Sequence, residues 1–263
     1  KSPLVTPILG PHAIYSLNLE QLKETRRVAA FTDTPISIHL SESEFELEYS
    51  NQNYGMTSIE ALDSIDFFNG RTIAAHVVWP TKKEIAILAN KNVGVVHNPT
   101  SNMKLASGIS PIADMLKAGV LIGLGTDGAA SNNDLDMWEE MRLAALLQKV
   151  TKMDPEALPA NTILRMATTN GAQIIGLGDK IGRLEVGMKA DIIQVEFSDV
   201  HHQPSYDIAS HLVYVTDEQD VITVIVDGKL IMHEDQFYTI NTNRVSNEVA
   251  TIAEKIRNSV KKN

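Results

Sequence analysis

Cysteine is absent from all 263 residues of this chain. Its absence excludes disulfide bonds and thiolate metal sites together. It also excludes the zinc deaminases that bind their metal through His and a Cys-x-x-Cys element. The sequence has no signal-peptide pattern and no apolar run of about 20 residues. We therefore expect a cytoplasmic protein without a membrane partner.

Positive charge is scarce, because 23 Lys and Arg residues stand against 33 Asp and Glu residues, for a net charge of -10. Repulsion from phosphates argues against a nucleic-acid partner, although local contacts can still bind a small nucleotide-like molecule. Aromatic residues make up only 5% and form no stacking stripe. With 43% hydrophobic residues, the chain can still bury a core, in one large domain or two small ones.

Strand and helix signals alternate over the first two thirds of the chain. Short apolar runs predict five strands, at 5–9, 36–39, 73–78, 93–97 and 120–125. Apolar residues at helical spacing predict helices at 19–31, 57–68, 81–90, 109–118, 135–150 and 160–175. Apolar strands that alternate with helices are typical of a parallel sheet buried on both faces, so the expected fold class is α/β.

The pattern changes after Gly176, where turn signals and short strands replace the long helices. Asp227-Gly228 lies between two apolar runs, which predicts a β-hairpin. The expected elements are a strand, the two hairpin strands and a last helix, at 192–195, 221–226, 229–232 and 247–262.

Polar side chains stand at the C-terminal ends of three predicted strands. His39 and His76 end two of these strands. Glu42 follows the first by three residues, and Asp127 follows the last. Since the carboxyl ends of parallel strands meet at one edge, we expect these groups to converge. Imidazoles and a carboxylate can hold a divalent metal that lowers the pKa of bound water, so the pattern predicts a metal-dependent hydrolytic site.

Six short segments follow one another in a specific order. They are PHAIYS at 11–16, IHLSE at 38–42, AHVVW at 75–79, HNPTSNMKLASG at 97–108, GTDGAASNN at 125–133 and GRLEVGMKAD at 182–191. Together they resemble the amidohydrolase superfamily over about residues 10–237. The most similar branch is that of the 5-methylthioadenosine/S-adenosylhomocysteine deaminases, with chlorohydrolases and guanine deaminases nearby.

The resemblance implies a partial (β/α)8 TIM barrel, strands four to eight, followed by part of a small β-sandwich. The expected domains are the C-terminal portion of the barrel at 1–176, the C-terminal strands of the sandwich at 177–238 and a C-terminal helix at 239–263. Such a barrel has open apolar edges at 5–9 and 120–125. Because exposed edges pair, we expect a homo-oligomer or association with a missing N-terminal segment.

The resemblance also implies roles for the strand-end residues. One divalent metal is expected, zinc in the first place, although iron or manganese also suits nitrogen and carboxylate ligands. His39 and Asp127 would bind it, and Asp127 would accept the proton of the attacking water. Glu42 would protonate the adenine ring nitrogen. His76 would hydrogen-bond the attacking hydroxide and the tetrahedral intermediate.

Further residues would contact a small nucleoside substrate. His12 would contact its nucleoside part, Ser131 is a second candidate, and Glu42 and His76 would also touch it. The expected function is metal-dependent hydrolytic deamination of adenosine-type nucleosides. Guanine deamination or chlorohydrolysis on the same scaffold is one alternative, and a non-catalytic fragment that only binds metal or assembles is another. Glu42 favours deamination, because protonation of a ring nitrogen needs an acid there.

The sequence departs from the family in its metal ligands. The family's first two histidines lie in a His-x-His on the first barrel strand, and no such pair occurs here. The chain also opens directly in a strand-like segment without Met. We therefore expect an incomplete copy of the enzyme that is inactive by itself. Ile14 and Asn98, where the family often has Pro and Cys, are interpreted as packing differences.

Other candidates are assigned no catalytic role. His97 ends a strand but is interpreted as structural, His201 and His202 as a loop pair, and His211 and His233 as surface residues. Residues 123–128 match Gly-x-Gly-x-x-Gly and follow a strand. A dinucleotide site requires a helix to begin at once, whereas Ala-Ala-Ser-Asn-Asn follows here, and Asp127 would repel the phosphate.

Overall fold

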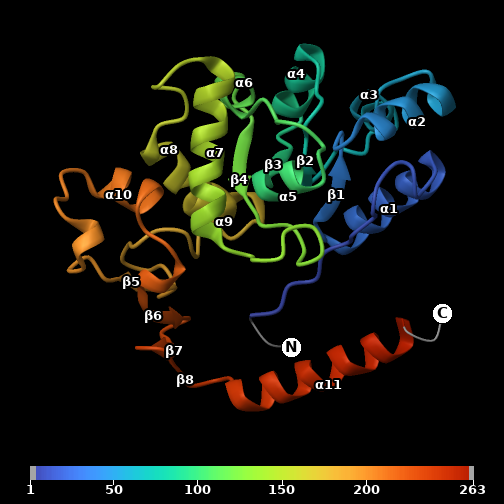
Figure 1. Ribbon diagram of the computed structural model, residues 1–263. Helices are drawn as coiled ribbons and strands as arrows, with labels where there is room; N and C mark the ends of the chain where they lie inside the picture. Colours follow the sequence, from blue (N-terminus) through green and yellow to red (C-terminus); the bar gives the residue numbers. More distant parts are fainter. Residues whose placement is uncertain (1–3, 261–263) are drawn as a thin grey trace. The chain divides into compact units, whose positions relative to one another are not determined.

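The computed structural model describes residues 4–260 and divides into two compact units. Unit 1 comprises Lys1–Arg183 and Pro204–Glu218, and unit 2 comprises Leu184–Gln203 and Gln219–Asn263. Figure 1 shows that helices surround the strands of unit 1 and that unit 2 contains a small group of strands and one long helix.

The sheet of unit 1 is parallel, with the strand order β1-β2-β3-β4. Its strands are β1 (Ile36–Leu40), β2 (Thr72–His76), β3 (Gly94–His97) and β4 (Leu121–Leu124). Residues of these strands are largely buried, as expected of a parallel sheet covered by helices. The predicted α/β class with a parallel sheet is confirmed, as are four of the five predicted strands.

The strand predicted at 5–9 is wrong. Only Leu9 joins the sheet, through a single parallel bridge to Ile36, and Val5 and Ile8 are exposed. Pro7 lies in this segment, and because proline has no N–H it cannot donate to a ladder of hydrogen bonds. The apolar run therefore leads up to the sheet without extending it.

Helices connect and follow these strands, and several begin with side-chain caps. Thr81 accepts a hydrogen bond from the N–H of Glu84, whose side chain accepts from the Thr81 N–H, as a capping box requires. Asn18 and Gln21 form the same arrangement. The helices are α1 (Leu19–Thr32), α2 (Glu44–Tyr54), α3 (Ser58–Ser64), α4 (Lys82–Asn90), α5 (Pro99–Lys104), α6 (Ile112–Lys117), α7 (Met137–Lys152), α8 (Ala160–Arg165), α9 (Gly171–Ile174) and α10 (Ile208–Tyr214).

Some helices differ from the prediction. The helix expected at 57–68 ends at Ser64, since Asp66 takes left-handed backbone, and the one expected at 109–118 begins only after Pro111. Sequence patterns missed three short helices: α2, α5 and α10.

The long helix expected at 160–175 is interrupted by a π-helical turn, η1 (Met166–Asn170). This turn packs on β4 and leads into α9. The side chain of Ile174 then packs against Gly94 and Gly123. A Cβ atom added to Gly94 would lie 2.8 Å from this side chain, and one added to Gly123 would lie 3.1 Å from it. Two glycines in the sheet thus accept one isoleucine, and a continuous α-helix would present a different face to them.

Unit 2 contains an antiparallel sheet in the order β5-β6-β7-β8. Its elements are β5 (Ile192–Val195), η2 (Val200–His202), β6 (Val221–Val226), β7 (Lys229–His233), β8 (Gln236–Phe237) and α11 (Thr242–Val260), while η3 (Glu218–Asp220) spans the boundary between units. The predicted hairpin is confirmed. Asp227 and Gly228 both have positive φ, 50° and 75°, as a tight turn between twisted strands requires.

Two expectations for unit 2 need correction. His201 and His202 are not a plain loop pair, because they lie in the 3-10 helix η2 and His202 is fully buried against the ring of Phe197. The last helix begins at Thr242, five residues before the expected start, and residues 261–262 of the expected helix lie outside the described residues. Among residues 4–260, every helix is too short or too polar to cross a membrane.

Candidate metal and catalytic site

The ends of the parallel strands turn sharply, and this brings the polar side chains into one place. His76 and Val77 have φ values of 73° and 45° at the end of β2, and Asp127 has a φ of 62° after β4. Left-handed backbone costs a non-glycine residue on the order of 1–3 kcal/mol. Local hydrogen bonds offset part of this cost: the Val77 N–H donates to Leu40 O (3.0 Å), and the Gly128 N–H donates to Asp127 Oδ1 (2.7 Å).

The four strand-end residues singled out by the sequence lie together. His76 Nε2 is 3.9 Å from Glu42 Oε2 and 4.0 Å from Asp127 Oδ2. The rings of His39 and His76 stack with centroids 5.5 Å apart. One ligand atom each from His39, His76 and Asp127 lies within 4.8 Å of the others. The convergence that the parallel topology predicts is therefore present.

Hydrogen bonds orient both imidazoles in the same way. His39 Nδ1 lies 2.8 Å from the carbonyl oxygen of His12, and His76 Nδ1 lies 2.8 Å from Asn102 Oδ1. Since both partners are acceptors, Nδ1 carries a proton in each ring, and in the neutral ring the lone pair lies on Nε2. Two such nitrogens beside a carboxylate are a donor set that fits a divalent metal such as zinc.

Asp127 is held as an anion by its neighbours. Burial raises its pKa, but hydrogen bonds from the Ser101 hydroxyl (Oγ to Oδ2, 2.7 Å) and the Gly128 N–H outweigh this effect. The nearby His76 ring and the Ser131 hydroxyl act in the same direction, so the pKa lies below its ordinary value. A carboxylate held ionised can bind a cation, and it is in the protonation state that can accept a proton from a water whose own pKa a bound metal has lowered.

Glu42 is half-buried and stands on a turn that another carboxylate fixes. The fully buried Glu46 of α2 accepts the N–H groups of Ser41 (2.7 Å) and Glu42 (3.0 Å). Burial raises the pKa of Glu46 in spite of these hydrogen bonds. The Ser107 hydroxyl lies 3.4 Å from Glu42 Oε1, and Trp79 Nε1–H donates to the carbonyl oxygen of Ser107 (2.7 Å). The backbone at Glu42 is thereby fixed while its side chain faces the site.

Glu140 of α7 joins two segments that carry site residues. It is fully buried and accepts the Thr100 N–H (3.2 Å) at the start of α5 and Asn132 Nδ2–H (2.6 Å) in the loop after Asp127. Burial raises the pKa of Glu140. The helix α5 carries both Ser101 and Asn102, so this one carboxyl anchors the partners of Asp127 and His76.

The remaining candidates lie around this group. His12 is exposed, its ring centroid is 4.6 Å from that of His39, and its Nε2 is 3.1 Å from the Tyr15 hydroxyl. Ser131 lies in the loop after Asp127 and is half-buried. His97 ends β3, is buried, and neither ring nitrogen has a hydrogen-bond partner among the described residues. Burial lowers the pKa of His97 to about 3, and nearby His76 acts in the same direction.

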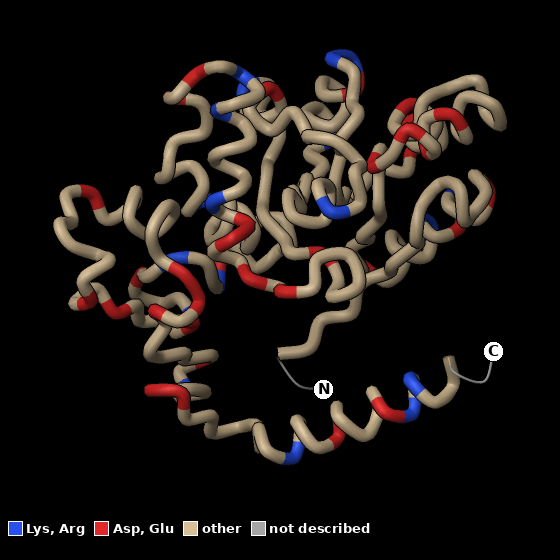
Figure 2. The backbone as a smooth tube through the Cα atoms, in the orientation of Figure 1, with Lys and Arg blue, Asp and Glu red and all other residues tan. Residues whose placement is uncertain are grey.

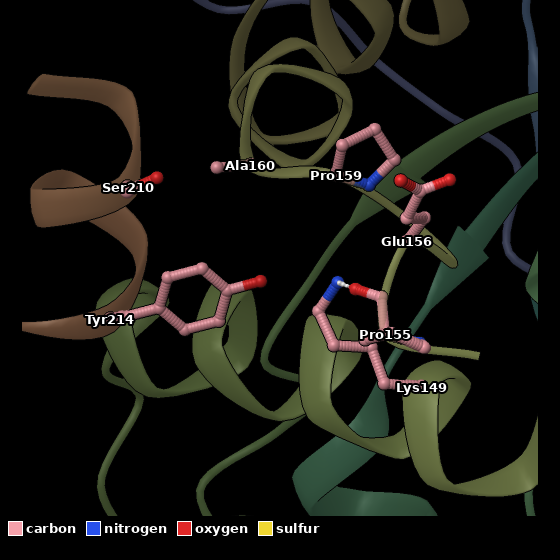
Figure 3. A pocket seen from close by; sticks show the side chains of 7 residues that line it. All are labelled: Lys149, Pro155, Glu156, Pro159, Ala160, Ser210 and Tyr214. Atoms are coloured by element: carbon pink, nitrogen blue, oxygen red, sulfur yellow. Dashed lines mark hydrogen bonds between the residues drawn. The ribbon is translucent and has the colours of Figure 1, made fainter. Parts of the chain in front are cut away.

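A separate pocket of unit 1 contains none of these residues (Figure 3). It is lined by Lys149, Pro155, Glu156, Pro159, Ala160, Ser210 and Tyr214, from α7, α8, α10 and the loop between α7 and α8. The Lys149 ammonium donates to the carbonyl oxygens of Pro155 (2.7 Å) and Ala157 (2.9 Å). Its charge therefore anchors the loop.

Sequence reasoning missed the residues that support the site. Ser101, Asn102 and Glu140 each lie far along the chain from the residue or segment they support. Glu46 stands three residues after the helix cap Ser43, a spacing typical of a capping box. Its carboxylate instead accepts the N–H of Ser41 in the preceding turn. Only the folded arrangement reveals these contacts.

Comparisons with known proteins show the family of this chain. The amidohydrolase family model matches residues 1–231. A 5-methylthioadenosine/S-adenosylhomocysteine deaminase of Desulforudis audaxviator is 45% identical, covering 97% of this chain and 60% of that protein. A 5'-deoxyadenosine deaminase of Methanosarcina mazei is 44% identical, covering 96% of this chain and 58% of that protein.

The structural comparison points the same way. The zinc-bound structure of an adenosine deaminase from Xanthomonas campestris superposes with a TM-score of 0.95 at 37% identity, covering 98% of this chain and 58% of that one. The chain thus spans about three fifths of the length of these relatives. From the family match and the identities, the chain belongs to the amidohydrolase family.

Proposed function

We propose that this chain is the metal-binding, catalytic part of a hydrolytic deaminase of adenosine-type nucleosides such as 5-methylthioadenosine or S-adenosylhomocysteine. The observation that carries the proposal is the approach of Glu42 and Asp127 to the same nitrogen of His76, at 3.9 and 4.0 Å. Two carboxylates and an imidazole around one point can manage the two proton transfers of a deamination. The names of the similar proteins support the substrate class.

The proposed roles are those that the resemblance implies, and the hydrogen bonds of the site support them. A divalent metal, zinc or else iron or manganese, would supply activated water at neutral pH. His39 and Asp127 would hold it, with His76 in reach. Asp127, ionised and fixed by Ser101, would accept the proton of the water. Glu42 would give a proton to the ring nitrogen, and His76 would hydrogen-bond the oxygen added to the ring.

Two further residues are proposed to contact the substrate. His12 lies beside His39 and is exposed, so its ring is available to the nucleoside. Ser131 borders the site through its hydrogen bond to Asp127. Both residues lie beside strand-end residues, His12 next to His39 and Ser131 in the loop after Asp127, and the ligands of such folds bind at this end of the strands.

We further propose the domain arrangement that the resemblance implies. Residues 1–176 would form the C-terminal portion of a (β/α)8 barrel, 177–238 part of a β-sandwich and 239–263 a C-terminal helix. The chain has no His-x-His, so it would carry only part of the metal shell and be inactive alone. Activity would require a complementary N-terminal segment or another chain, in the cytoplasm.

A chimera tests this proposal. The N-terminal part of the Desulforudis audaxviator protein that this chain does not match would be joined to Lys1, and ammonia release from 5-methylthioadenosine measured with added zinc. We expect turnover by the chimera and none by the chain alone. Glu42→Gln should lower turnover by about 10²- to 10⁴-fold, because the acid is lost.

A matched variant separates the loss of the catalytic acid from the loss of one negative charge. Glu60→Gln removes the same group from an exposed ion pair with Lys83 and should leave turnover unchanged. Guanine and a chlorotriazine, offered as other substrates, should react poorly. Turnover by the isolated chain, or full activity of Glu42→Gln in the chimera, would contradict the proposal.

A further inference from the structure

A second cluster of metal-ligand side chains lies in unit 2. His201 Nε2 is 3.0 Å from Asp220 Oδ1, and His202 Nε2 is 3.2 Å from Asp220 Oδ2. The two imidazoles are 4.1 Å apart between centroids. One ligand atom from each of the three residues lies within 4.8 Å of the others. The cluster is separate from the strand-end site, whose residues all belong to unit 1.

The cluster is built into the fold on both sides. His202 is fully buried, and its ring stacks on Phe197 with centroids 4.4 Å apart and planes 13° from parallel. Asp220 is 7% exposed, and its carbonyl oxygen accepts the Glu196 N–H (2.8 Å) at the end of β5. His201 is 44% exposed at its side chain, which leaves one side of the cluster open to solvent.

We propose that His201, His202 and Asp220 form a second divalent-metal site of the zinc type. Two imidazole nitrogens and one carboxylate oxygen are a donor set that zinc accepts, with water in the remaining position. Ligands about 2.0–2.2 Å from a metal lie roughly 3–4 Å from one another. The two nitrogen–oxygen distances, 3.0 and 3.2 Å, lie in this range, and the ligand atoms all lie within 4.8 Å of one another. The single carboxylate supplies the negative charge that a cation between two neutral imidazoles needs.

The metal would link two segments that the chain separates. His201 and His202 lie in η2, after β5, whereas Asp220 immediately precedes β6. A metal shared by the three side chains would join η2 to the start of the central hairpin. Bound metal would therefore raise the melting temperature of the chain without involving the strand-end site.

Zinc binding to the full chain tests this proposal. The variant His39→Gln/Asp127→Asn removes ligands of the strand-end site. Equilibrium dialysis against zinc, followed by elemental analysis, should still find one zinc per chain, and zinc should raise its melting temperature. Adding His201→Gln, a change at the partly exposed ligand, should weaken the remaining affinity at least tenfold and abolish the thermal shift.

Two further variants complete the test. Asp220→Asn keeps the shape of the side chain but removes the charge, and should weaken zinc binding as His201→Gln does. His233→Gln removes a histidine elsewhere in unit 2, on β7, and should change neither readout. Absence of zinc from the His39→Gln/Asp127→Asn variant, or zinc binding unaffected by His201→Gln, would overturn the proposal and leave the cluster as a hydrogen-bonded ion pair.

Discussion

At the scale of single residues, neighbouring side chains set the state of each candidate functional group. Asn102 accepts from His76 Nδ1–H, and this leaves Nε2 of His76 facing the two carboxylates. Ser101 orients the carboxylate of Asp127 by donating a hydrogen bond to Oδ2. Both supporting residues come from the short helix α5, so its placement matters as much as the groups that meet the metal.

Replacing Asn102 should disturb the metal site without touching a ligand. In Asn102→Leu, His76 Nδ1–H loses its acceptor, and the ring is free to turn or change tautomer. We expect zinc affinity at the strand-end site to fall by about 10- to 100-fold, as is typical for the loss of a supporting hydrogen bond around a metal site, because His76 lies within reach of the metal. Competition with a chromophoric chelator, in a background that carries His201→Gln, measures it. Asn69→Leu, at an exposed position, is the control, and equal affinities would contradict the prediction.

Glu140 should make stability depend on pH. Because burial raises its pKa in the folded chain, the folded state holds this proton more tightly than the unfolded state does. The associated stability is present below the ordinary pKa of 4.5 and is lost as the pH rises through the folded pKa. The free energy of unfolding of Glu140→Gln, relative to the unsubstituted chain, should therefore increase from pH 4.5 to 7.

Urea unfolding at several pH values measures this difference. Glu139→Gln removes a carboxyl from the neighbouring position of α7 and is the control for net charge. A relative stability of Glu140→Gln that stays constant with pH would show that the buried carboxyl ionises as readily in the folded as in the unfolded chain.

The sequence was sufficient for the residues at strand ends and insufficient for their partners. His39, His76 and Asp127 could be found because parallel strands bring their carboxyl ends together wherever the helices lie. Asn102 and Glu140 could not be found in this way, since their contacts depend on how α5 and α7 pack. His202 was misjudged because a buried and an exposed histidine look the same within a turn-rich stretch.

At the scale of helices and strands, local chemistry predicts the starts of helices better than their interiors. The capping box at Thr81 and the hairpin turn at Asp227-Gly228 depend on neighbours within four residues. The hairpin was predicted and is confirmed, and the capping box is present. The π-turn at 166–170 is decided by the two glycines of the sheet that receive Ile174. Glycines in β3 and β4 read only as weak strand positions in the sequence, so the interruption was not expected.

The capping box of α4 should be measurable. Thr81→Ala removes the acceptor for the Glu84 N–H, and the helix start loses one of its satisfied donors. We expect a loss of about 1 kcal/mol in the free energy of unfolding. Thr25→Ala removes the same atoms from a half-buried position inside α1, where no helix cap is lost, and should cost less. A Thr81→Ala variant as stable as the Thr25→Ala variant would contradict the prediction.

At the scale of the whole molecule, charged residues of both signs are spread along the chain. Figure 2 shows acidic and basic residues on many separate elements, and both signs occur along α11. Apolar side chains are exposed at several places instead, including Leu4 and Val5 before the sheet and Val249, Ile252 and Ile256 on α11. Exposed apolar surface of this kind favours association.

We expect the isolated chain to associate. Sedimentation at micromolar concentration should show species heavier than the 28.9 kDa of one chain. In the chimera described above, the added segment should cover the sheet edges next to β1 and β4, and self-association should decrease. A compact monomer of the isolated chain would contradict this expectation, as would a chimera that associates equally.

The path of the chain between the two units has a consequence for cleavage. The backbone leaves unit 1 after Arg183 and returns at Pro204 to form α10. Val213 of α10 is fully buried. Just after this helix, the Thr216 carbonyl oxygen accepts a hydrogen bond from the Arg142 guanidinium (2.8 Å). A protease that cuts within 184–203 would therefore not release the C-terminal portion. The two fragments should co-elute in size-exclusion chromatography under native conditions and should separate only in denaturant.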